Sequence, residues 1–430
     1  MKRNKKSQRG GAGLRVSVYT SVIFLSLFLS YLLICPYLAH LAAESQTEEG
    51  FLKAVRLDPD NAAYYHDLGR YYQFNLFQPD IKKAISFYEK ALRLNPMSVS
   101  SLLDLARAYQ FIGEKARAEM VMGNVVKLNP MDPQTIWDVG VFYVVEGMPL
   151  QGMESLKRYI ELDPEKQSEV YDLCYKMGIT PEYILYNLVP HSFRFYRDYL
   201  GYLMDSNMLD NAVMAYKRMP KDGMNKDIFL RLCNLLIAKG RYDDAMDVWK
   251  DLLKTIRGKT RLANPDGRNL IYNGDLDYDI MNGGFDWRLR KAEGVDVYVD
   301  NDIYMAGTRS IGITFDGEHN PDITVMKQIV VVKPQTRYML KAHIKTDGLT
   351  TSNGLFLEVT GIGCNSLDAR SEVVTGTNLW KEIGVEFSTP DDCKAVVVAV
   401  RRQRSLRFDN KIGGNAWIDG ISLTQTDDRG

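Results

Sequence analysis

Residues 99–130 read VSSLLDLARAYQFIGEKARAEMVMGNVVKLNP, and this stretch decides the fold of the first half of the chain. It holds two amphipathic segments of helical periodicity and ends in an Asn-Pro pair. Asn95-Pro96, Asn129-Pro130 and Asp163-Pro164 each close such a stretch, so the prolines recur every 34 residues. Proline ends a helix because it lacks the backbone N–H and clashes with the preceding turn. A fixed period of this length predicts repeated units of two helices each.

The three units share residue types at corresponding places. Two antiparallel helices approach closely only where small side chains meet large ones, and small and large residues recur together here. In spacing and residue type the units resemble the tetratricopeptide repeat. We expect one helical solenoid over residues 44–258, with five or six units, some of them irregular. The shared positions are Tyr65, Leu68, Gly69, Tyr72, Ala84, Tyr88 and Ala91, then Leu102, Leu105, Ala106, Tyr109, Ala118, Met122 and Val125, then Ile136, Val139, Gly140, Tyr143, Gly152, Leu156 and Tyr159.

A solenoid of this kind presents an extended concave face built from the first helix of each unit. The resemblance implies that this face binds a peptide or a segment of a protein partner. The Lys and Asn set with which some family members clamp a terminal carboxylate is absent from this sequence. A second interpretation is that the array is only a spacer that lifts the last domain off a membrane. The predicted partner-binding residues are His66, Arg70, Gln73, Arg107, Gln110, Trp137, Val141 and Val144.

An apolar run from Val16 to Ala43 follows residues 1–15, which carry six basic residues and no acidic one. About 20 apolar residues in a helix span the ~30 Å hydrocarbon core, whereas the apolar core of a cleaved signal peptide has about 7–15. The run therefore predicts a transmembrane signal anchor at 16–43. Because basic flanks stay in the cytoplasm, residues 1–15 are expected there. The rest is expected outside a cytoplasmic (inner) membrane that the chain crosses once, in the periplasm.

A cleaved signal peptide is the alternative interpretation of this run. A cut after Ala43 would place Leu41 where a small residue is preferred. Cys35 is not typical of a lipoprotein site, because Ile34 precedes it where a small residue is required. These residues favour retention of the anchor.

The charge and cysteine content exclude two classes of protein. Lys plus Arg (54) equals Asp plus Glu (54), so no bulk positive field is present to hold nucleic acid. Five cysteines in 430 residues are too few to staple the fold. We therefore expect a globular protein that does not bind nucleic acid.

The periodicity changes after a linker at 259–268. From Asn269 onward, short apolar and polar alternations are separated by Gly, Pro, Asn and Asp, which is typical of an antiparallel β-sandwich. We place this domain at 269–424, with a tail at 425–430. The fold class is thus multidomain α + β, with a transmembrane helix, an all-α solenoid and a jelly-roll sandwich. Expected strands are Val295–Val299, Ser310–Phe315, Thr324–Val332, Tyr338–Thr346, Leu355–Thr360, Trp380–Ser388, Ala395–Arg401 and Ala416–Leu423.

Five segments carry a resemblance to a family: Asn269–Leu276, Gly283–Trp287, Gln328–Pro334, Leu379-Trp380 and Ala416–Leu423. They resemble carbohydrate-binding modules of the galactose-binding-like type. The resemblance implies that exposed aromatic rings cover sugar faces, and that a structural calcium ion is held at Asp275, Asp277 and Asp419. Asp277 follows Leu276 where the family has an acidic residue after an aromatic one, so calcium occupancy is left open. No other cofactor is expected.

The predicted glycan-binding residues are Trp287, Tyr298, Tyr304, Arg402 and Arg404. The rings are suited to stacking on pyranoses, and the guanidinium groups are suited to carboxylate or sulfate groups of an acidic polysaccharide. A solvated edge is the other interpretation of the arginine run. A disulfide between Cys364 and Cys393 is compatible with an oxidising compartment, although sequence does not determine it.

No catalytic residue is predicted. HExxH, CxxC, GxSxG and GxxxxGK[ST] patterns are all absent. We therefore expect a non-enzymatic scaffold that binds protein through its repeats and glycan through its sandwich. By architectural analogy, it would act in bacterial exopolysaccharide or envelope-polysaccharide assembly or export. The alternatives are a purely structural protein–protein adaptor whose sandwich has lost sugar binding, and, less favoured, a polysaccharide-acting enzyme with a site near Tyr183–Tyr202.

Overall fold

The computed structural model describes residues 8–220, 226–257, 268–364, 366–408 and 410–426. Parts of three predicted segments lie outside these residues: 1–7 of the basic segment, 259–267 of the linker and 427–430 of the tail. The chain divides into two compact units, Met1–Tyr202 and Leu203–Gly430, with the boundary inside one helix, α11 (Phe193–Asp205).

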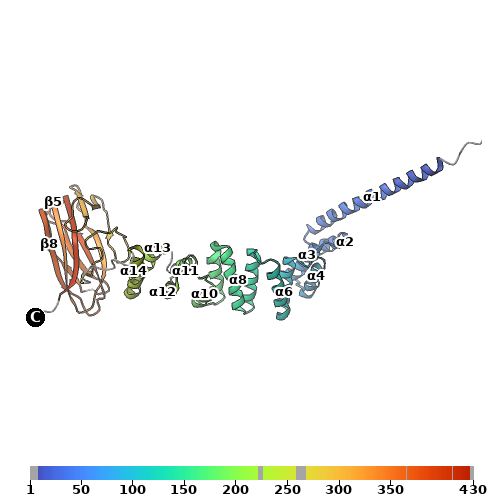
Figure 1. Cartoon of the computed structure of the whole chain (residues 1–430), viewed down its shortest axis with the longest axis horizontal. Helices are drawn as coiled ribbons and strands as arrows, with labels where there is room; N and C mark the ends of the chain where they lie inside the picture. The colour runs from blue at the N-terminus through green and yellow to red at the C-terminus, as the bar shows by residue number, and fades with distance from the viewer. Residues whose placement is uncertain (1–7, 221–225, 258–267, 365, 409, 427–430) are drawn as a thin grey trace, which may run out of the picture. The chain divides into compact units, whose positions relative to one another are not determined.

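The first unit is helical throughout its described part. The predicted pairs are α3–α4, α5–α6 and α7–α8, which follow one another along the chain in Figure 1. The second helix of each pair ends one residue before its Asn-Pro or Asp-Pro, so the repeat prediction is confirmed. The helices are α1 (Gln8–Ala43), α2 (Glu48–Leu57), α3 (Ala62–Phe74), α4 (Ile81–Leu94), α5 (Val99–Phe111), α6 (Lys115–Leu128), α7 (Pro133–Val145), α8 (Pro149–Leu162), α9 (Gln167–Lys176), α10 (Pro181–Asn187) and α11, with a short 3₁₀ turn at Pro164–Lys166.

Local sequence explains where these helices begin. The side chains of Asp80, Ser98 and Asp132 each accept a hydrogen bond from the backbone N–H three residues later, at the start of α4, α5 and α7. This satisfies one of the N–H groups that a helix leaves unpaired at its N-terminus. Gly113 follows α5 at φ +80° and Gly147 follows α7 at φ +76°, a left-handed conformation that glycine adopts without steric cost. Each turn is therefore specified by its own residues.

The packing inside a pair depends on its small residues. A Cβ atom at Gly69 would lie 2.4 Å from the Tyr88 ring, and one at Gly140 would lie 2.8 Å from the Leu156 side chain. Tyr88 and Leu156 have no exposed surface, so neither can move aside into solvent. The predicted contact of small with large residues is thus the contact that sets the distance between the two helices.

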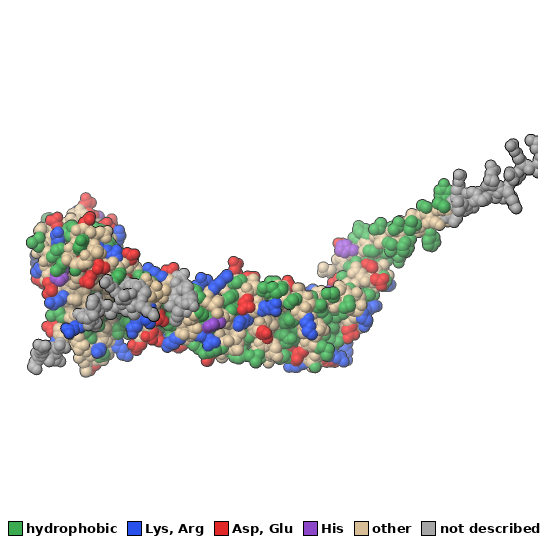
Figure 2. Space-filling model, in the orientation of Figure 1, with side chains coloured by type: hydrophobic (Ala, Val, Ile, Leu, Met, Phe, Trp, Pro, Cys, Tyr) green, Lys and Arg blue, Asp and Glu red, His purple; other side chains and the backbone are tan. Residues whose placement is uncertain are grey.

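Helix α1 is the one helix among the described residues that is long and apolar enough to cross a membrane, over Val18–Ala43. Its side chains from residue 18 onward are largely exposed, as the apolar surface in Figure 2 shows. Its last turns differ, because Ala39 is fully buried against Ala54 of α2 and Tyr64 of α3. The C-terminal end of α1 therefore acts as the first helix of an additional pair with α2.

The described part of the second unit holds the end of α11, three further helices and a β-sandwich. Its five-stranded antiparallel sheets have the orders β1-β4-β9-β6-β7 and β2-β3-β10-β5-β8, which confirms the predicted class. Strands β1 and β7 were not expected, because two and three residues are too short to show an alternating pattern. The elements are α12 (Leu209–Arg218), α13 (Lys226–Ala238), α14 (Tyr242–Arg257), β1 (Arg288–Leu289), β2 (Val295–Asp300), β3 (Ser310–Asp316), β4 (Ile323–Val331), β5 (Arg337–Leu349), β6 (Phe356–Gly361), β7 (Asp368–Arg370), β8 (Gly376–Ser388), β9 (Ala395–Arg402) and β10 (Gly413–Gln425).

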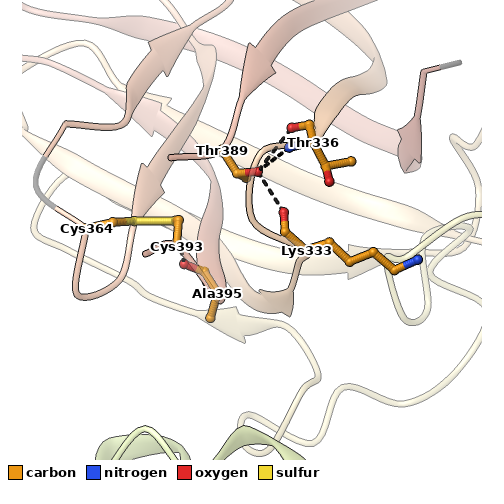
Figure 3. The surroundings of a disulfide bond; sticks show 6 residues. All are labelled: Lys333, Thr336, Cys364, Thr389, Cys393 and Ala395. Carbon is orange, nitrogen blue, oxygen red and sulfur yellow. Dashed lines mark hydrogen bonds between the residues drawn. A yellow bond between two sulfur atoms is a disulfide. The ribbon is translucent and has the colours of Figure 1, made fainter. Parts of the chain in front are cut away.

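Cys364 and Cys393 form a disulfide, with 5.2 Å between their Cα atoms (Figure 3). It closes a segment with a sequence separation of 29 residues, and a loop of that size corresponds to about 3–4 kcal/mol of stabilisation in the chain-entropy model. Nearby, the Thr389 hydroxyl donates to the Lys333 carbonyl at 2.7 Å and accepts from Thr336 N at 3.0 Å. These contacts join the chain before β5 to the chain between β8 and β9.

Candidate binding surfaces

A ladder of charged side chains joins the first helices of consecutive repeats. Asp104 on α5 lies at its centre and is almost fully buried. From α3, His66 Nε2 lies 3.0 Å and Arg70 Nε 3.9 Å from its Oδ2 atom. Arg107 Nη1 lies 3.3 Å from Asp104 Oδ1, and Arg107 Nη2 lies 2.8 Å from Asp138 Oδ1 on α7. The ladder therefore ties α3, α5 and α7 to one another.

Three predicted partner-binding residues thus have a structural partner inside the protein. A buried carboxylate is costly unless hydrogen bonds and cations compensate it, and Asp104 has the His66 ring nitrogen at hydrogen-bond distance and the cations Arg70 and Arg107 beside it. His66 is mostly buried, whereas the two arginines keep about half of their side chains exposed. Only the arginines remain accessible to a partner.

The other predicted residues of this face differ in accessibility. Val144 is buried against the close approach of α8, where a Cβ at Gly152 would lie 2.5 Å from its Cγ2, so the prediction that it faces a partner is wrong. Trp137 is half-buried and its ring lies 5.2 Å from that of Tyr159 on α8. Gln73 accepts a hydrogen bond from the Tyr88 hydroxyl at 2.6 Å. The two that remain, Gln110 and Val141, are half-buried.

Sequence reasoning missed an exposed apolar series on these helices. Phe74, Phe111 and Val145 are the last residues of α3, α5 and α7, and their side chains are 54%, 73% and 52% exposed. We call these three residues the apolar edge. Each directly follows a residue that was predicted to bind a partner. Comparing equivalent positions of the three repeats could therefore have identified this apolar series. Because repeats stack side by side, equivalent residues of consecutive units form a row.

The irregular region near Tyr183–Tyr202 has the properties of a packed core. The rings of Tyr171 and Tyr199 lie 4.7 Å apart, and the Tyr175 and Tyr199 hydroxyls are 3.0 Å apart. Burial raises the pKa of Tyr171 and of Tyr199 above the usual tyrosine value, which keeps both phenols protonated. These side chains hold α9 to α11 and lack the depressed pKa of an activated group.

In the sandwich, two predicted glycan-binding residues are buried, and those predictions are wrong. Trp287 has no exposed surface, and its indole Nε1 donates to the Asn273 carbonyl at 3.0 Å. Arg402 is also fully buried and donates to the Pro321 carbonyl and to Asn320 Oδ1. Burial lowers its pKa from the usual arginine value. Neither side chain can touch a polysaccharide, because both lie entirely inside the domain.

A row of four residues crosses the outer face of the sheet β2-β3-β10-β5-β8. In the antiparallel register of this sheet, Tyr298 on β2 lies opposite Gly312 on β3. Gly312 lies opposite Trp417 on β10, which in turn lies opposite Lys345 on β5. They alternate with core residues such as Ile311 and Ile418, so their side chains lie on the side away from the core. A Cβ at Gly312 would lie 2.5 Å from the Tyr298 ring, which therefore rests over this glycine. Of the row, only Tyr298 was predicted.

Trp417 is fixed within this row from both sides. Its Nε1 donates to Asp300 Oδ2 at 2.8 Å, and Lys345 Nζ lies 5.5 Å from its ring centroid. Burial opposes ionisation of Asp300, but hydrogen bonds from the backbone of Asp302 and Ile303 and from Trp417 lower its pKa below the usual value. Asp300 therefore stays a carboxylate that orients the indole ring, most of which is covered.

Tyr304 lies beside this sheet on the loop between β2 and β3, and it is partly exposed. The loop is held from β10, because the backbone N–H groups of Met305 and Ala306 donate to Asp419 Oδ2 at 2.8 and 2.9 Å. We call Tyr298, Lys345 and Trp417 the aromatic face, and Tyr304 lies on a loop that follows β2. The aromatic face offers ring surface next to a cation and a carboxylate, which is the combination that sugar sites use. Arg404, also predicted, is exposed on the β9–β10 loop.

Two of the three predicted calcium ligands, Asp277 and Asp419, serve as hydrogen-bond acceptors. Asp277 Oδ1 accepts from Thr308 N at 2.7 Å, and the Asp419 oxygens accept from Met305, Ala306 and Gly420. Within the described part of the chain, no group of three or more His, Cys, Asp or Glu side chains is placed to hold a metal ion. Burial and, to a smaller extent, the charge of Asp275 raise the pKa of Asp419, so these two carboxyl groups lie near each other, and the calcium site stays a prediction.

No protein-family model and no curated protein sequence matches the chain. Solved structures are similar to each half. YrrB, a TPR protein with an unusual peptide-binding site, is 18% identical over 50% of this chain and 96% of its own, with a TM-score of 0.26. MamA is 19% identical over 39% and 82%, with a TM-score of 0.25. A family 16 carbohydrate-binding module is 22% identical over 36% and 99%, with a TM-score of 0.27. The helical half resembles TPR proteins, and the sandwich resembles carbohydrate-binding modules.

Proposed function

We propose that the chain is a non-catalytic, membrane-anchored scaffold that binds a protein segment along its repeats and a glycan on its sandwich. Its place would be the periplasmic side of a bacterial cytoplasmic membrane, in the assembly or export of exopolysaccharide or envelope polysaccharide. The observation that carries the protein-binding part is the apolar edge, with exposed apolar residues at the same position in three successive repeats.

Two features support the extracytoplasmic location. Basic residues precede the apolar helix, which is the arrangement that leaves the following domains outside the cytoplasm. The Cys364–Cys393 disulfide belongs to an oxidising compartment, because cytosolic reductants keep most thiols reduced. Retention of the anchor is supported by Ala39, which α1 contributes to the first helix pair.

Photo-crosslinking in cells tests the protein-binding part. A photoreactive amino acid at Phe74, Phe111 or Val145 is expected to give one and the same crosslinked partner. Met120, which is equally exposed but lies on the second helix α6, is the matched control and is expected to give none. If all four positions give the same background, the array is the spacer of the second interpretation.

Affinity electrophoresis through gels that contain acidic or neutral polysaccharides tests the glycan-binding part. We expect at least one polymer to retard the wild type, and Tyr304→Ala and Tyr298→Ala to weaken retardation about tenfold, since ring stacking contributes roughly 1–1.5 kcal/mol. Leu379→Ala, at another exposed apolar residue of the sandwich, is the control. Absence of retardation on every polymer would favour the adaptor whose sandwich has lost sugar binding.

A further inference from the structure

The loop between β9 and β10 carries two large apolar side chains that are almost entirely in solvent. Leu406 is 94% and Phe408 106% exposed. The next large exposed side chain of this domain, Leu379, lies on strand β8. Leu406 and Phe408 lie two positions apart, and exposing two large apolar side chains so close together is unfavourable in water unless something covers them.

The base of this loop is held in place by hydrogen bonds. Asn320 Oδ1 accepts from Ser405 N at 2.9 Å, and Asn320 Nδ2 donates to the Ser405 carbonyl at 2.9 Å. Asn353 Nδ2 donates to the Arg404 carbonyl at 3.3 Å, and Arg407 N donates to Ser405 Oγ at 3.2 Å. Buried Arg402 braces the same segment through the Asn410 carbonyl, at 3.2 Å. The backbone is therefore tied to the domain, while the side chains of Leu406 and Phe408 are left outside.

Cations surround the two apolar side chains. Arg404, Arg407 and Lys411 are exposed, and residues 403–412 contain one acidic residue, Asp409. No ion pair among the described residues involves these three cations, whereas Arg401 just before them is paired with Glu358 and Asp322. The loop thus presents apolar groups together with a net positive charge.

This chemistry is that of a membrane-interface contact. Leu and Phe enter the boundary between headgroups and acyl chains, and Arg and Lys are attracted by anionic headgroups. A sugar site would instead need a ring platform with polar groups converging on hydroxyls, and Leu406 supplies no flat face. We propose that the β9–β10 loop docks on a bilayer surface that contains anionic phospholipid, as a second membrane contact besides α1.

A bridging assay with the full chain tests this proposal. The protein is reconstituted through α1 into fluorescent nanodiscs of phosphatidylcholine, and these are floated with separate vesicles that contain about 30% phosphatidylglycerol. We expect the nanodiscs to float with these vesicles, not with pure phosphatidylcholine vesicles, and to be released at about 0.5 M salt. Leu406→Ser with Phe408→Ser is expected to reduce flotation about tenfold, and so is Arg404→Gln with Arg407→Gln.

Leu379→Ser is the matched control and is expected to float like the wild type. An environment-sensitive dye on Leu406→Cys gives a second readout, because the described cysteines of the soluble part are disulfide-bonded or buried. Its emission is expected to shift to the blue with anionic vesicles.

Flotation that is unaffected by the loop variants, or that needs no phosphatidylglycerol, would overturn the proposal. The proposal would also be overturned if the dye emission did not shift with anionic vesicles and an acidic polysaccharide retarded the protein in a way that depended on the loop residues. That result would assign the loop to glycan binding. Failure of the glycan or partner tests above would leave this result unchanged.

Discussion

Gly69 illustrates how a single residue sets the distance between two helices. A methyl group there would overlap the ring of Tyr88, which is fully buried and whose hydroxyl is bound to Gln73. We expect Gly69→Ala to lower the free energy of unfolding of the helical unit by about 1–3 kcal/mol, because the ring has no free space to move into. Urea unfolding, followed by circular dichroism in detergent, measures the change.

Gly123 on α6 is the matched control for this substitution. A Cβ atom there would meet nothing within 4 Å, so Gly123→Ala is expected to raise stability by about 0.5–1 kcal/mol through its helix propensity. A Gly69→Ala variant as stable as the wild type would show that α3 and α4 can separate without cost. The packing explanation of the repeat pattern would then be wrong.

The residue scale also shows where sequence reasoning about the sites succeeded and where it failed. Arg70 and Arg107 were predicted on an accessible face and keep about half of their side chains exposed, but their ion pairs with Asp104 and Asp138 were not predicted. Trp287 could not be placed in the same way. A tryptophan in a segment without periodicity is equally compatible with solvent or core, and only the fold brings the Asn273 carbonyl to its indole.

At the scale of elements, helices α3 to α8 were predictable because proline, small residues and caps all recur with the same period. The end of α1 was not predictable in this way. A membrane-spanning run is apolar on every side, so its sequence shows no amphipathic pattern that would mark the face packed on α2. The apolar run and the first helix of the additional pair are in fact parts of one continuous helix, α1.

The continuity of α1 leads to a prediction about Ala39, which is fully buried against Ala54 and Tyr64. Ala39→Glu would bury a carboxylate without a partner and is expected to destabilise the first pair by at least about 2 kcal/mol. Faster hydrogen exchange in α2 and α3, in nanodiscs, would report it. His40→Gln, at an exposed neighbouring site, is expected to leave exchange unchanged.

Equal protection of α2 in wild type and Ala39→Glu would contradict this account, as would an intact mass showing that the mature chain begins after Ala43. Either result would mean that α1 is not part of the folded array. Cleavage after Ala43 would in addition release the chain from the membrane, and the anchored scaffold would then have to be abandoned in favour of a secreted one.

At the scale of the whole second unit, the last helix pair and the sandwich share a core. Trp249 on α14 is buried, its ring lies 5.1 Å from that of Tyr272, and a Cβ at Gly284 would lie 2.4 Å from it. Asn234 on α13 accepts hydrogen bonds from Gly284 N at 2.8 Å and from Arg288 Nη2 at 2.9 Å. Sequence periodicity assigns these residues to separate domains, because it describes each element alone and not the contacts between unlike elements.

This shared core predicts that α13, α14 and the sandwich unfold as one cooperative unit. Trp249→Ala is expected to cost about 3–5 kcal/mol, and Asn234→Ala about 1–3 kcal/mol, because the first leaves a cavity and the second leaves buried donors unpaired. In both variants, hydrogen exchange should become faster in α13 and α14 than in β5 and β10, so that one urea transition divides into two. Leu379→Ala, which is exposed on β8, should keep a single transition. A single transition in Trp249→Ala would mean that the helix pair depends on the rest of the solenoid for its stability, and that the sandwich is not coupled to the helices through this contact.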